Sequence, residues 1–261
     1  MAGRLHGKRA VVTGASTGIG AAIARAFAAE GARVVVHYGR SRERAEEVVA
    51  ECRTLGRGVG RGQGGDAMAI QADIARREDV HRLVHEAYLL LGGVDIWANI
   101  AGADILTGAG AELPDHEKLA LLLSVDLLGT MECCWQVAPR MKADGGGAIL
   151  NMSWDLALSG MSGRNPEIFA AVKGGITGFS KCLALSWAPE VRVNDLAPGW
   201  IATTFAEEVM TTEYYEHIVA ATPLARFGRP EDVARAAVFL VSDEAAFLTA
   251  QTLKINGGLS S

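Results

Sequence analysis

Hydrophobic and polar positions divide the chain into short apolar runs and longer amphipathic stretches. Runs of strand length begin near residues 10, 34, 67, 94, 148, 191 and 252, and stretches with helical spacing separate them. Strands that alternate with helices are typical of βαβ units, in which successive strands are parallel. The pattern therefore predicts an α/β fold: a doubly wound parallel sheet with helices on both faces.

Two of the helical stretches are long. One spans residues 117–142 and the other residues 168–187. The leucine cluster at 119–123 in the first stretch favours core or a subunit interface over a cofactor-binding segment. The mixed segment 205–223 follows the sixth strand, and we interpret it as a mobile substrate lid.

Length and charge narrow the class of protein. A chain of 261 residues suits one α/β domain, here residues 1–261, with a large core. Lysine and arginine number 25 against 30 acidic residues, so no broad basic surface for nucleic acid or anionic lipid is expected. The composition indicates a protein that acts on a small molecule.

The cysteines and the N-terminus point to a reducing compartment. The four cysteines have neither CxxC nor His/Cys ligand spacing, so we expect free thiols and no metal. No apolar leader segment precedes the first strand, and no run of about 18 apolar residues occurs. We therefore expect no membrane partner and a cytoplasmic location.

A glycine-rich turn lies where the first apolar run gives way to a helical pattern. Gly14 lets the chain reverse after the strand, Gly18 lets backbone approach a phosphate, and Gly20 lets the helix pack closely. The free amide groups of the helix's first turn, with its positive dipole end, are suited to an anion. The turn is a candidate site for a dinucleotide pyrophosphate, although such turns can also serve packing alone.

The second strand ends in a basic segment instead of an acidic residue. An acidic side chain there would hold the ribose hydroxyls of a dinucleotide, whereas Arg40 and Ser41 suit a 2′-phosphate. The alternative is a solvated helix start. After the third strand, Asp73 is a candidate either for the adenine amino group or for capping the next helix.

Four motifs occur in a fixed order along the chain, and together they resemble the short-chain dehydrogenase/reductase family over essentially its whole length. They are Thr13-Gly14-x-x-x-Gly18-Ile19-Gly20, Asn99-Ile100-Ala101-Gly102, Arg192-Val193-Asn194 with Pro198-Gly199, and Gly228 to Ala234. The second motif departs from that family's NNAG pattern at its second asparagine. The resemblance implies a single Rossmann-type domain, an NAD(P) cofactor, and a homotetramer or homodimer formed through the two long helices.

The resemblance also implies the cofactor-binding positions, with Arg40 and Ser41 favouring NADP over NAD. The pyrophosphate and ribose would contact the glycine turn, the adenine the end of the third strand, and the nicotinamide amide the end of the sixth strand. The positions are Gly14, Ser16, Thr17, Gly18, Ile19, Gly20, Arg40, Ser41, Asp73, Ile74, Asn99, Ala101, Gly102, Lys173, Pro198, Gly199, Ile201 and Thr203.

The resemblance breaks at the catalytic positions. That family pairs a tyrosine with a lysine four residues later; Lys173 is present here, but the preceding position is Phe169. The family's serine position falls on Trp154, or on Asp155 if the alignment slides, and its asparagine position falls on Asp126. The chain therefore lacks the expected catalytic tyrosine, serine and asparagine.

Three groups are candidates for the missing proton donor. They are Lys173, Asp126 and Asp155, the last because burial against an indole raises the pKa of a carboxyl group. The first two can instead form a buried structural ion pair, with Lys173 binding ribose. Tyr214 or Tyr215 can enter from the lid.

The sequence leaves three functions open. The first is an NADP-dependent oxidoreductase that acts on a small carbonyl or alcohol with an atypical proton donor. The second is a catalytically silent NADP-binding protein. The third is a non-redox lyase or isomerase that uses Asp155 or Asp126 as base.

Overall fold

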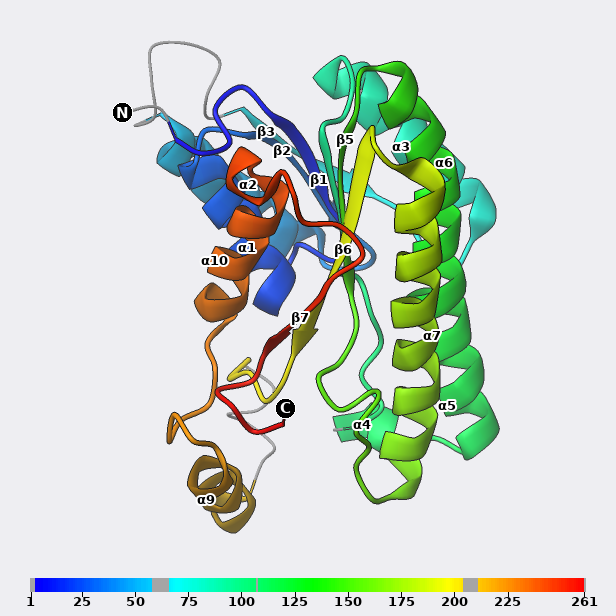
Figure 1. The fold of residues 1–261 in the computed structure, drawn as a ribbon, viewed down its shortest axis with the longest axis vertical. Helices are drawn as coiled ribbons and strands as arrows, with labels where there is room; N and C mark the ends of the chain where they lie inside the picture. Colours follow the sequence, from blue (N-terminus) through cyan, green and yellow to red (C-terminus); the bar gives the residue numbers. More distant parts are fainter. Residues whose placement is uncertain (1–2, 58–65, 107, 204–210, 261) are drawn as a thin grey trace.

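One seven-stranded sheet organises the chain. The computed structural model describes residues 3–57, 66–106, 108–203 and 211–260. Its strands follow the order β3-β2-β1-β4-β5-β6-β7, and every neighbouring pair is parallel, so the predicted doubly wound α/β fold is confirmed (Figure 1). The elements are β1 Arg9–Val12, α1 Gly18–Ala29, β2 Arg33–Tyr38, α2 Arg42–Gly56, β3 Ala67–Gln71, α3 Arg77–Leu91, β4 Ile96–Asn99, α4 Gly108–Ala111, α5 Asp115–Leu122, a π-helical segment Leu123–Leu128, α6 Gly129–Ala143, β5 Gly147–Met152, α7 Arg164–Trp187, β6 Val191–Pro198, α9 Thr212–Ala221, α10 Pro230–Val241, a 3₁₀ turn Asp243–Ala245 and β7 Thr252–Ile255.

Helices cover both faces of the sheet. In Figure 1, α1, α2 and α10 lie on one side, and α3, α6 and α7 lie on the other. Alternate residues of one strand enter different cores: Val34 and Val36 pack under the first layer, and Val35 packs under the second. A strand with both faces buried needs no polar alternation. This explains why β2 is a continuous valine run.

The order in which the chain adds strands to the sheet reverses between β1 and β4. The chain builds outward from β1 to β2 and β3, then crosses to β4 on the other side of β1. Thr13, directly after β1, accepts hydrogen bonds at its Oγ1 from the backbone N–H groups of Ile100 (2.9 Å) and Ala101 (3.0 Å), directly after β4. These bonds hold the two strand ends together. A crevice at the carboxyl ends of such a pair is the usual ligand site of an open parallel sheet.

The first long helix is not continuous, contrary to the sequence prediction for 117–142. A π-helical segment, Leu123–Leu128, separates α5 from α6. A π turn holds one residue more than an α turn, which rotates the side chains within it. Asp126 lies in this segment with its side chain fully buried.

Element boundaries elsewhere agree with the prediction to within a few residues. The largest shift is at α7, which begins at Arg164 instead of residue 168, and β6 continues two residues further, to Pro198. Residues 205–210 of the predicted lid 205–223 lie outside the described residues. The second half of that lid contains helix α9.

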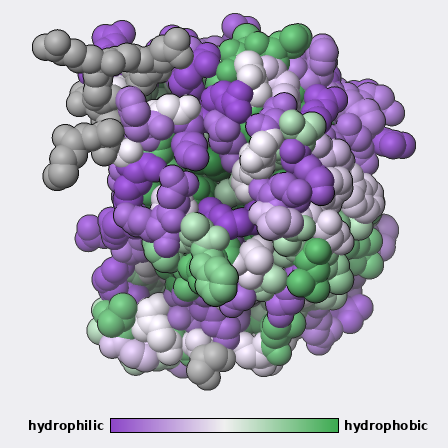
Figure 2. Space-filling model, turned by 45° about the horizontal axis from the view of Figure 1, so that its top comes forward, coloured by the Kyte–Doolittle hydropathy of each residue, from purple (hydrophilic) through white to green (hydrophobic). Residues whose placement is uncertain are grey.

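Two helical stretches are long and apolar enough to cross a membrane by length and composition alone: residues 115–143 and 164–187. Both pack against the second face of the sheet, with buried side chains such as Val137 and Ile176. Their place in the fold therefore accounts for their composition. Figure 2 turns the top of Figure 1 toward the viewer. The surface seen there is mainly hydrophilic, with separate hydrophobic groups.

Candidate functional site

The glycine turn after β1 fits a dinucleotide pyrophosphate. Gly18 has a φ of +54°, and a Cβ on it would meet only the Thr203 methyl group, 3.6 Å away across an open gap. A Cβ on Gly20 would lie 2.2 Å from the Gly14 carbonyl oxygen, so only glycine allows this turn to close. The α1 N-terminus has no side-chain cap at Thr17 and no acidic residue in its first turn. Its amide groups and dipole are therefore directed at an anion.

His37 holds this turn in place, and the sequence analysis missed it. Its Nδ1 accepts a hydrogen bond from the Gly14 N–H (3.0 Å), so the proton is on Nε2, which donates to the Ala72 carbonyl oxygen (3.1 Å). Burial lowers the pKa of His37 to about 4, so the ring is neutral at neutral pH. The sequence did carry a signal for this role, because His37 directly follows three valines in a buried strand.

The adenosine side of the site contains four of the predicted positions. Arg40 and Ser41 are exposed at the start of α2, where a phosphate could reach them. The Asp73 carboxylate accepts a hydrogen bond from the Ala75 N–H (3.0 Å), which closes a local turn before α3 and does not cap that helix. Ile74 is buried in the core beneath α3 and α6.

Asn99 turns away from the crevice. Its Nδ2 donates to Asn151 Oδ1 (2.8 Å), and its Oδ1 accepts from the Trp97 indole (2.7 Å), in a buried network. The backbone of Ala101 instead lies against Gly14, where a Cβ on the glycine would be 2.7 Å from the Ala101 Cα. This stretch therefore shapes the crevice through its backbone and not through the asparagine side chain.

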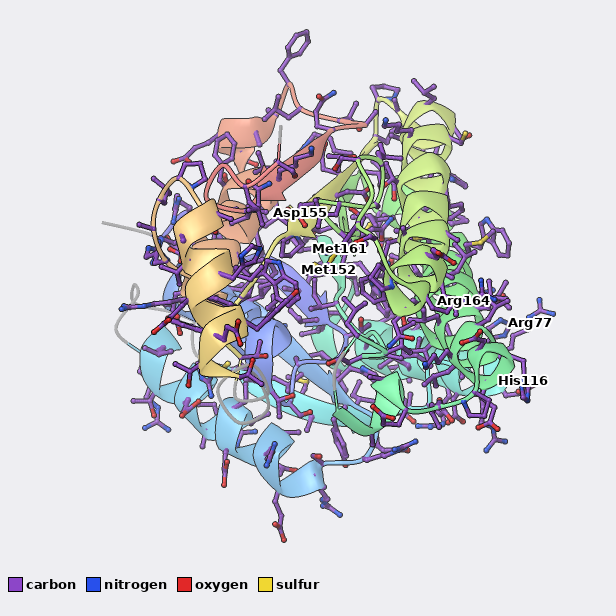
Figure 3. The ribbon with its side chains drawn as sticks, turned by 90° about the horizontal axis from the view of Figure 1, so that it is seen from below. Arg77, His116, Met152, Asp155, Met161 and Arg164 are labelled. Carbon is purple, nitrogen blue, oxygen red and sulfur yellow. The ribbon has the colours of Figure 1, made fainter. Side chains whose placement is uncertain are left out.

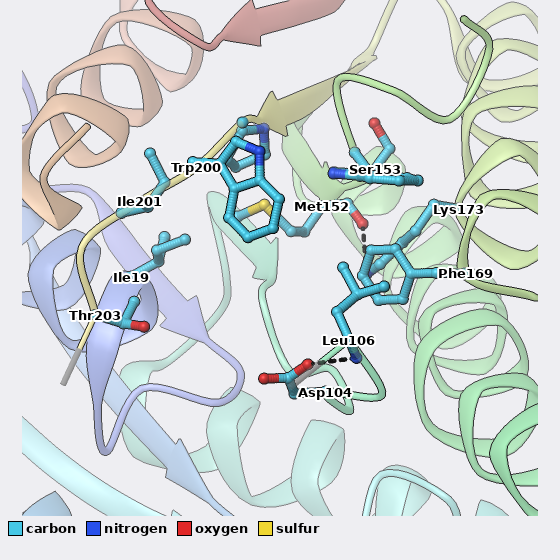
Figure 4. Close-up of a pocket in the computed structure, with 13 residues that line it drawn as sticks. Ile19, Asp104, Leu106, Met152, Ser153, Phe169, Lys173, Trp200, Ile201 and Thr203 are labelled. Carbon is cyan, nitrogen blue, oxygen red and sulfur yellow. Dashed lines mark hydrogen bonds between the residues drawn. The ribbon is translucent and has the colours of Figure 1, made fainter. Parts of the chain in front are cut away.

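A cavity of about 250 Å³ opens at the carboxyl ends of the strands (Figure 4). It brings together predicted cofactor residues and three positions, Trp154, Phe169 and Lys173, where the resemblance places catalytic residues. In Figure 4, Ile19, Ile201 and Thr203 lie on one side of the cavity, and Phe169 and Lys173 on the other. The lining residues are Ile19, Asp104, Leu106, Met152, Ser153, Trp154, Phe169, Lys173, Pro198, Gly199, Trp200, Ile201 and Thr203.

Lys173 and Asp126 form a buried ion pair. Lys173 Nζ lies 2.7 Å from Asp126 Oδ2 and donates a second hydrogen bond to the Met152 carbonyl oxygen (3.3 Å). Asp126 Oδ1 accepts from the Ala103 N–H (2.8 Å). The side chains are 6% and 0% exposed, so neither charge is neutralised by bulk water. The ammonium lines the cavity, but its charge is compensated by the Asp126 carboxylate, which is not among the residues that line the cavity.

Two aromatic rings occupy the positions where the resemblance places the catalytic hydroxyls. Trp154 and Phe169 pack edge to face, with ring centroids 5.2 Å apart. The Lys173 ammonium lies 5.4 Å from the Phe169 ring centroid. Ser153, next to Trp154, is 4% exposed and its hydroxyl is directed at the Leu196 carbonyl oxygen. The part of the cavity wall that Trp154 and Phe169 form is thus apolar.

Asp155 does not belong to the lining of this cavity. Its Oδ2 accepts from the Asn256 amide (3.1 Å) and the Ser260 hydroxyl (3.4 Å), which anchors the C-terminal segment. Burial raises the pKa of Asp155, and the hydrogen bond from Asn256 opposes the rise. Figure 3 shows Asp155 and Met152 near the middle of this end of the molecule, between α9 and α7.

Helix α9 contacts Trp200, a residue that lines the cavity. The Tyr214 ring packs edge to face on Trp200, with centroids 5.5 Å apart, and Tyr215 stacks on Phe227 at 4.6 Å. Burial raises the pKa of Tyr214. Neither tyrosine is among the residues that line the cavity.

Comparison with known proteins identifies the family. A family model described as "Enoyl-(Acyl carrier protein) reductase" matches residues 14–260. A 3-oxoacyl-[acyl-carrier-protein] reductase, FabG, from Staphylococcus aureus is 34% identical over 253 residues, which cover 97% of this chain and 98% of that protein. The chain belongs to the short-chain dehydrogenase/reductase family. Members of this family are oxidoreductases that use a nicotinamide cofactor.

Solved short-chain dehydrogenase/reductase structures superpose over nearly the whole chain. A 7α-hydroxysteroid dehydrogenase complexed with NADH and 7-oxo glycochenodeoxycholic acid has a TM-score of 0.87 at 33% identity, and the match covers 98% of this chain and 95% of that one. A short-chain dehydrogenase from Burkholderia cenocepacia in complex with NADP has a TM-score of 0.86 at 31% identity, with 99% and 100% covered. This agreement in fold extends through the candidate site.

Proposed function

We propose that the protein is an NADP-dependent oxidoreductase that acts on a small carbonyl compound or alcohol with an atypical proton donor. One observation carries the proposal: the predicted cofactor residues Ile19, Ile201 and Thr203 line one cavity that also contains Lys173, beside the open glycine turn. A glycine turn that served packing alone would not require an open cavity between these residues and Lys173.

The residues around the cavity fit the cofactor that the family uses. When bound, a nicotinamide cofactor supplies or removes a hydride. Amide groups of the α1 N-terminus would hold its phosphates, and Lys173 would face its ribose. The exposed Arg40 and Ser41 would hold a 2′-phosphate and so favour NADP over NAD.

Among the candidate proton donors, Lys173 is the one that the described cavity includes. Asp126 is a positioning residue, because it reaches the cavity only through its bond to Lys173. Asp155 is held at the C-terminal segment. Lys173 is therefore the candidate proton donor for a carbonyl substrate in this cavity.

A fluorescence titration with NADPH, and NADH as control, tests the proposal. We expect tight NADPH binding and at least tenfold weaker NADH binding. Arg40→Ala should raise the Kd for NADPH about tenfold and leave that for NADH unchanged, since a charge-assisted hydrogen bond contributes about 1.5 kcal/mol or more. The matched control is Arg44→Ala, also exposed on α2. Binding of neither cofactor would refute the proposed function.

A catalytically silent NADP-binding protein is the second candidate. The Trp154–Phe169 ring contact favours it, since both replaced hydroxyl positions are filled by apolar side chains. Cofactor binding without turnover of any C=O or C=N compound would select this candidate. No contact in the described site favours a lyase or isomerase, because both Asp126 and Asp155 are engaged in structural bonds.

We also propose a cytoplasmic homotetramer or homodimer that associates through the two long helices. Large apolar side chains are exposed on α6 and α7: Trp135 is 50% and Leu185 is 76% exposed. A packed interface between copies would cover such side chains.

A further inference from the structure

Phe169 and Trp200 present most of the aromatic surface of the cavity. Both side chains are partly exposed, whereas Trp154, which also lines the cavity, is only 9% exposed. In the view of Figure 4, the Phe169 and Trp200 rings lie on either side of the Met152 thioether. A ligand in this space would therefore contact aromatic rings and a polarisable sulfur atom, both of which interact favourably with another aromatic ring.

Both rings are held in place by other aromatic side chains. Phe169 packs edge to face on Trp154, with ring centroids 5.2 Å apart. Trp200 packs edge to face on Tyr214 (5.5 Å) and also contacts Phe227 (6.3 Å). Side chains that are already fixed lose little conformational entropy when a ligand binds. The aromatic surface is thus preorganised for a ligand.

The polar side chains beside these rings offer few hydrogen bonds to a substrate. The Ser153 hydroxyl is directed at the Leu196 carbonyl oxygen. Lys173 uses two of its three N–H donors for Asp126 and the Met152 carbonyl oxygen, which leaves the third for one substrate oxygen. A second polar group on the substrate would lose its water beside the rings with poor compensation, which is unfavourable. The site therefore favours a substrate with a single polar group.

The remaining donor of Lys173 lies close to an aromatic ring. Lys173 Nζ is 5.4 Å from the centroid of the Phe169 ring. A carbonyl oxygen that binds this ammonium would bring the group attached to its carbon against the ring. That group must therefore be apolar up to the reacting carbon itself, and a flat aromatic group suits such a surface best.

We propose that the substrate is a small aromatic ketone or aldehyde, or the corresponding alcohol, and that Phe169 and Trp200 bind its ring. This inference rests on the proposed function, since NADP is the redox partner. On reduction, the carbonyl carbon gains a hydride with two electrons from reduced NADP, and the C=O π pair moves to the oxygen. Lys173 donates a proton to that oxygen, which gives the alcohol, and then regains a proton from water.

Ligand affinity tests the inference without relying on turnover. Ligand-observed NMR titrations would compare acetophenone with cyclohexyl methyl ketone, which has the same carbon skeleton without a flat ring. Ethyl 3-oxobutanoate is the third probe, because it carries a second carbonyl group. Each titration would use the cofactor-free protein and the protein saturated with oxidised NADP. We expect acetophenone to bind at least fivefold more tightly than either of the other probes.

Variants that remove a ring but keep an apolar side chain assign the effect to these residues. Phe169→Leu and Trp200→Leu should each weaken acetophenone at least fivefold and leave cyclohexyl methyl ketone within twofold. Trp200→Phe retains a ring and should bind acetophenone within threefold of the wild type. Phe247→Leu, at a fully exposed position outside the cavity lining, is the matched control.

Three results would each overturn the inference. They are equal affinity of the wild type for the two ketones, tighter binding of ethyl 3-oxobutanoate than of acetophenone, and equal losses of both ketones in Phe169→Leu and Trp200→Leu. With NADPH, acetophenone should also be reduced with at least tenfold higher kcat/KM than cyclohexyl methyl ketone. Failure to bind NADPH, with the preference for acetophenone intact in the cofactor-free protein, would refute the proposed oxidoreductase function and leave the aromatic binding site standing.

Discussion

His37 makes the stability of the cofactor turn depend on pH. Its ring is buried between the Gly14 N–H and the Ala72 carbonyl oxygen, and burial lowers its pKa from 6.5 to about 4. Protonation would place a second N–H opposite the Gly14 N–H, so the folded state resists it. We predict that the variant His37→Asn removes this pH dependence, because the amide oxygen can accept the same N–H without titrating.

The sign and the size follow from the two pKa values. Between pH 6.5 and pH 4 the unfolded chain binds a proton at this residue and the folded chain does not. The contribution of His37 to the free energy of unfolding is therefore complete above pH 6.5 and decreases as the pH falls, by about 1.4 kcal/mol per pH unit. The total is about 3 kcal/mol at pH 4, and about 2 kcal/mol is lost by pH 5.

Urea unfolding of the cofactor-free protein between pH 8 and pH 5 measures this effect. The quantity to follow is the difference in free energy of unfolding between wild type and His37→Asn, because other titrating groups cancel in the difference. We expect wild type to lose about 2 kcal/mol relative to the variant between pH 7 and pH 5. A difference that stays constant over this range would refute the assignment of a neutral buried histidine.

Two further predictions concern buried carboxylates. Asp126→Asn and Lys173→Met should each lower the free energy of unfolding by about 3–5 kcal/mol, since each leaves an unpaired buried charge. The double variant should be at least about 2 kcal/mol more stable than the sum of the two single losses predicts. Additive losses in urea unfolding would contradict the pairing. Burial raises the pKa of Asp195 to about 6, with neither oxygen in a hydrogen bond of ordinary geometry. Asp195→Asn should therefore raise the free energy of unfolding by about 2–3 kcal/mol at pH 8, and the gain should vanish near pH 4, because ionisation destabilises the folded state only above the unfolded pKa. A gain that is the same at both pH values would exclude this cause.

The sheet could be predicted because its signals are local. Each strand is a short apolar run, and the valines of β2 are buried on both faces of the sheet. The glycine turn is local as well, since its requirement for glycine comes from contacts between neighbours such as Gly20 and the Gly14 carbonyl oxygen. Features of this kind depend on few residues and short loops, so pattern alone specifies them.

The π-helical segment and the candidate site depend on partners distant in sequence. Asp126 turns inward because Lys173, on another helix, supplies the opposite charge. Asp155 was a candidate acid because it lies next to Trp154 in the sequence. In the structure, its carboxylate accepts a hydrogen bond from the amide of Asn256, which is about a hundred residues away in the chain. Asn99 similarly finds Asn151 in the core. Side chains of the same type could serve catalysis or structure in each case, and only the fold decides which partner lies nearest.

The residues at positions 126, 154 and 169 form a consistent set. Without a hydroxyl at 169, the buried ammonium of Lys173 lacks a polar neighbour on that side, and the carboxylate at 126 supplies the compensation that burial requires. The indole of Trp154 packs on the Phe169 ring and fills the space that a smaller side chain would leave to water. A tyrosine restored at 169 alone would meet an ammonium already bonded to Asp126 and an apolar indole. Charge and packing are thus balanced for the residues that this site contains.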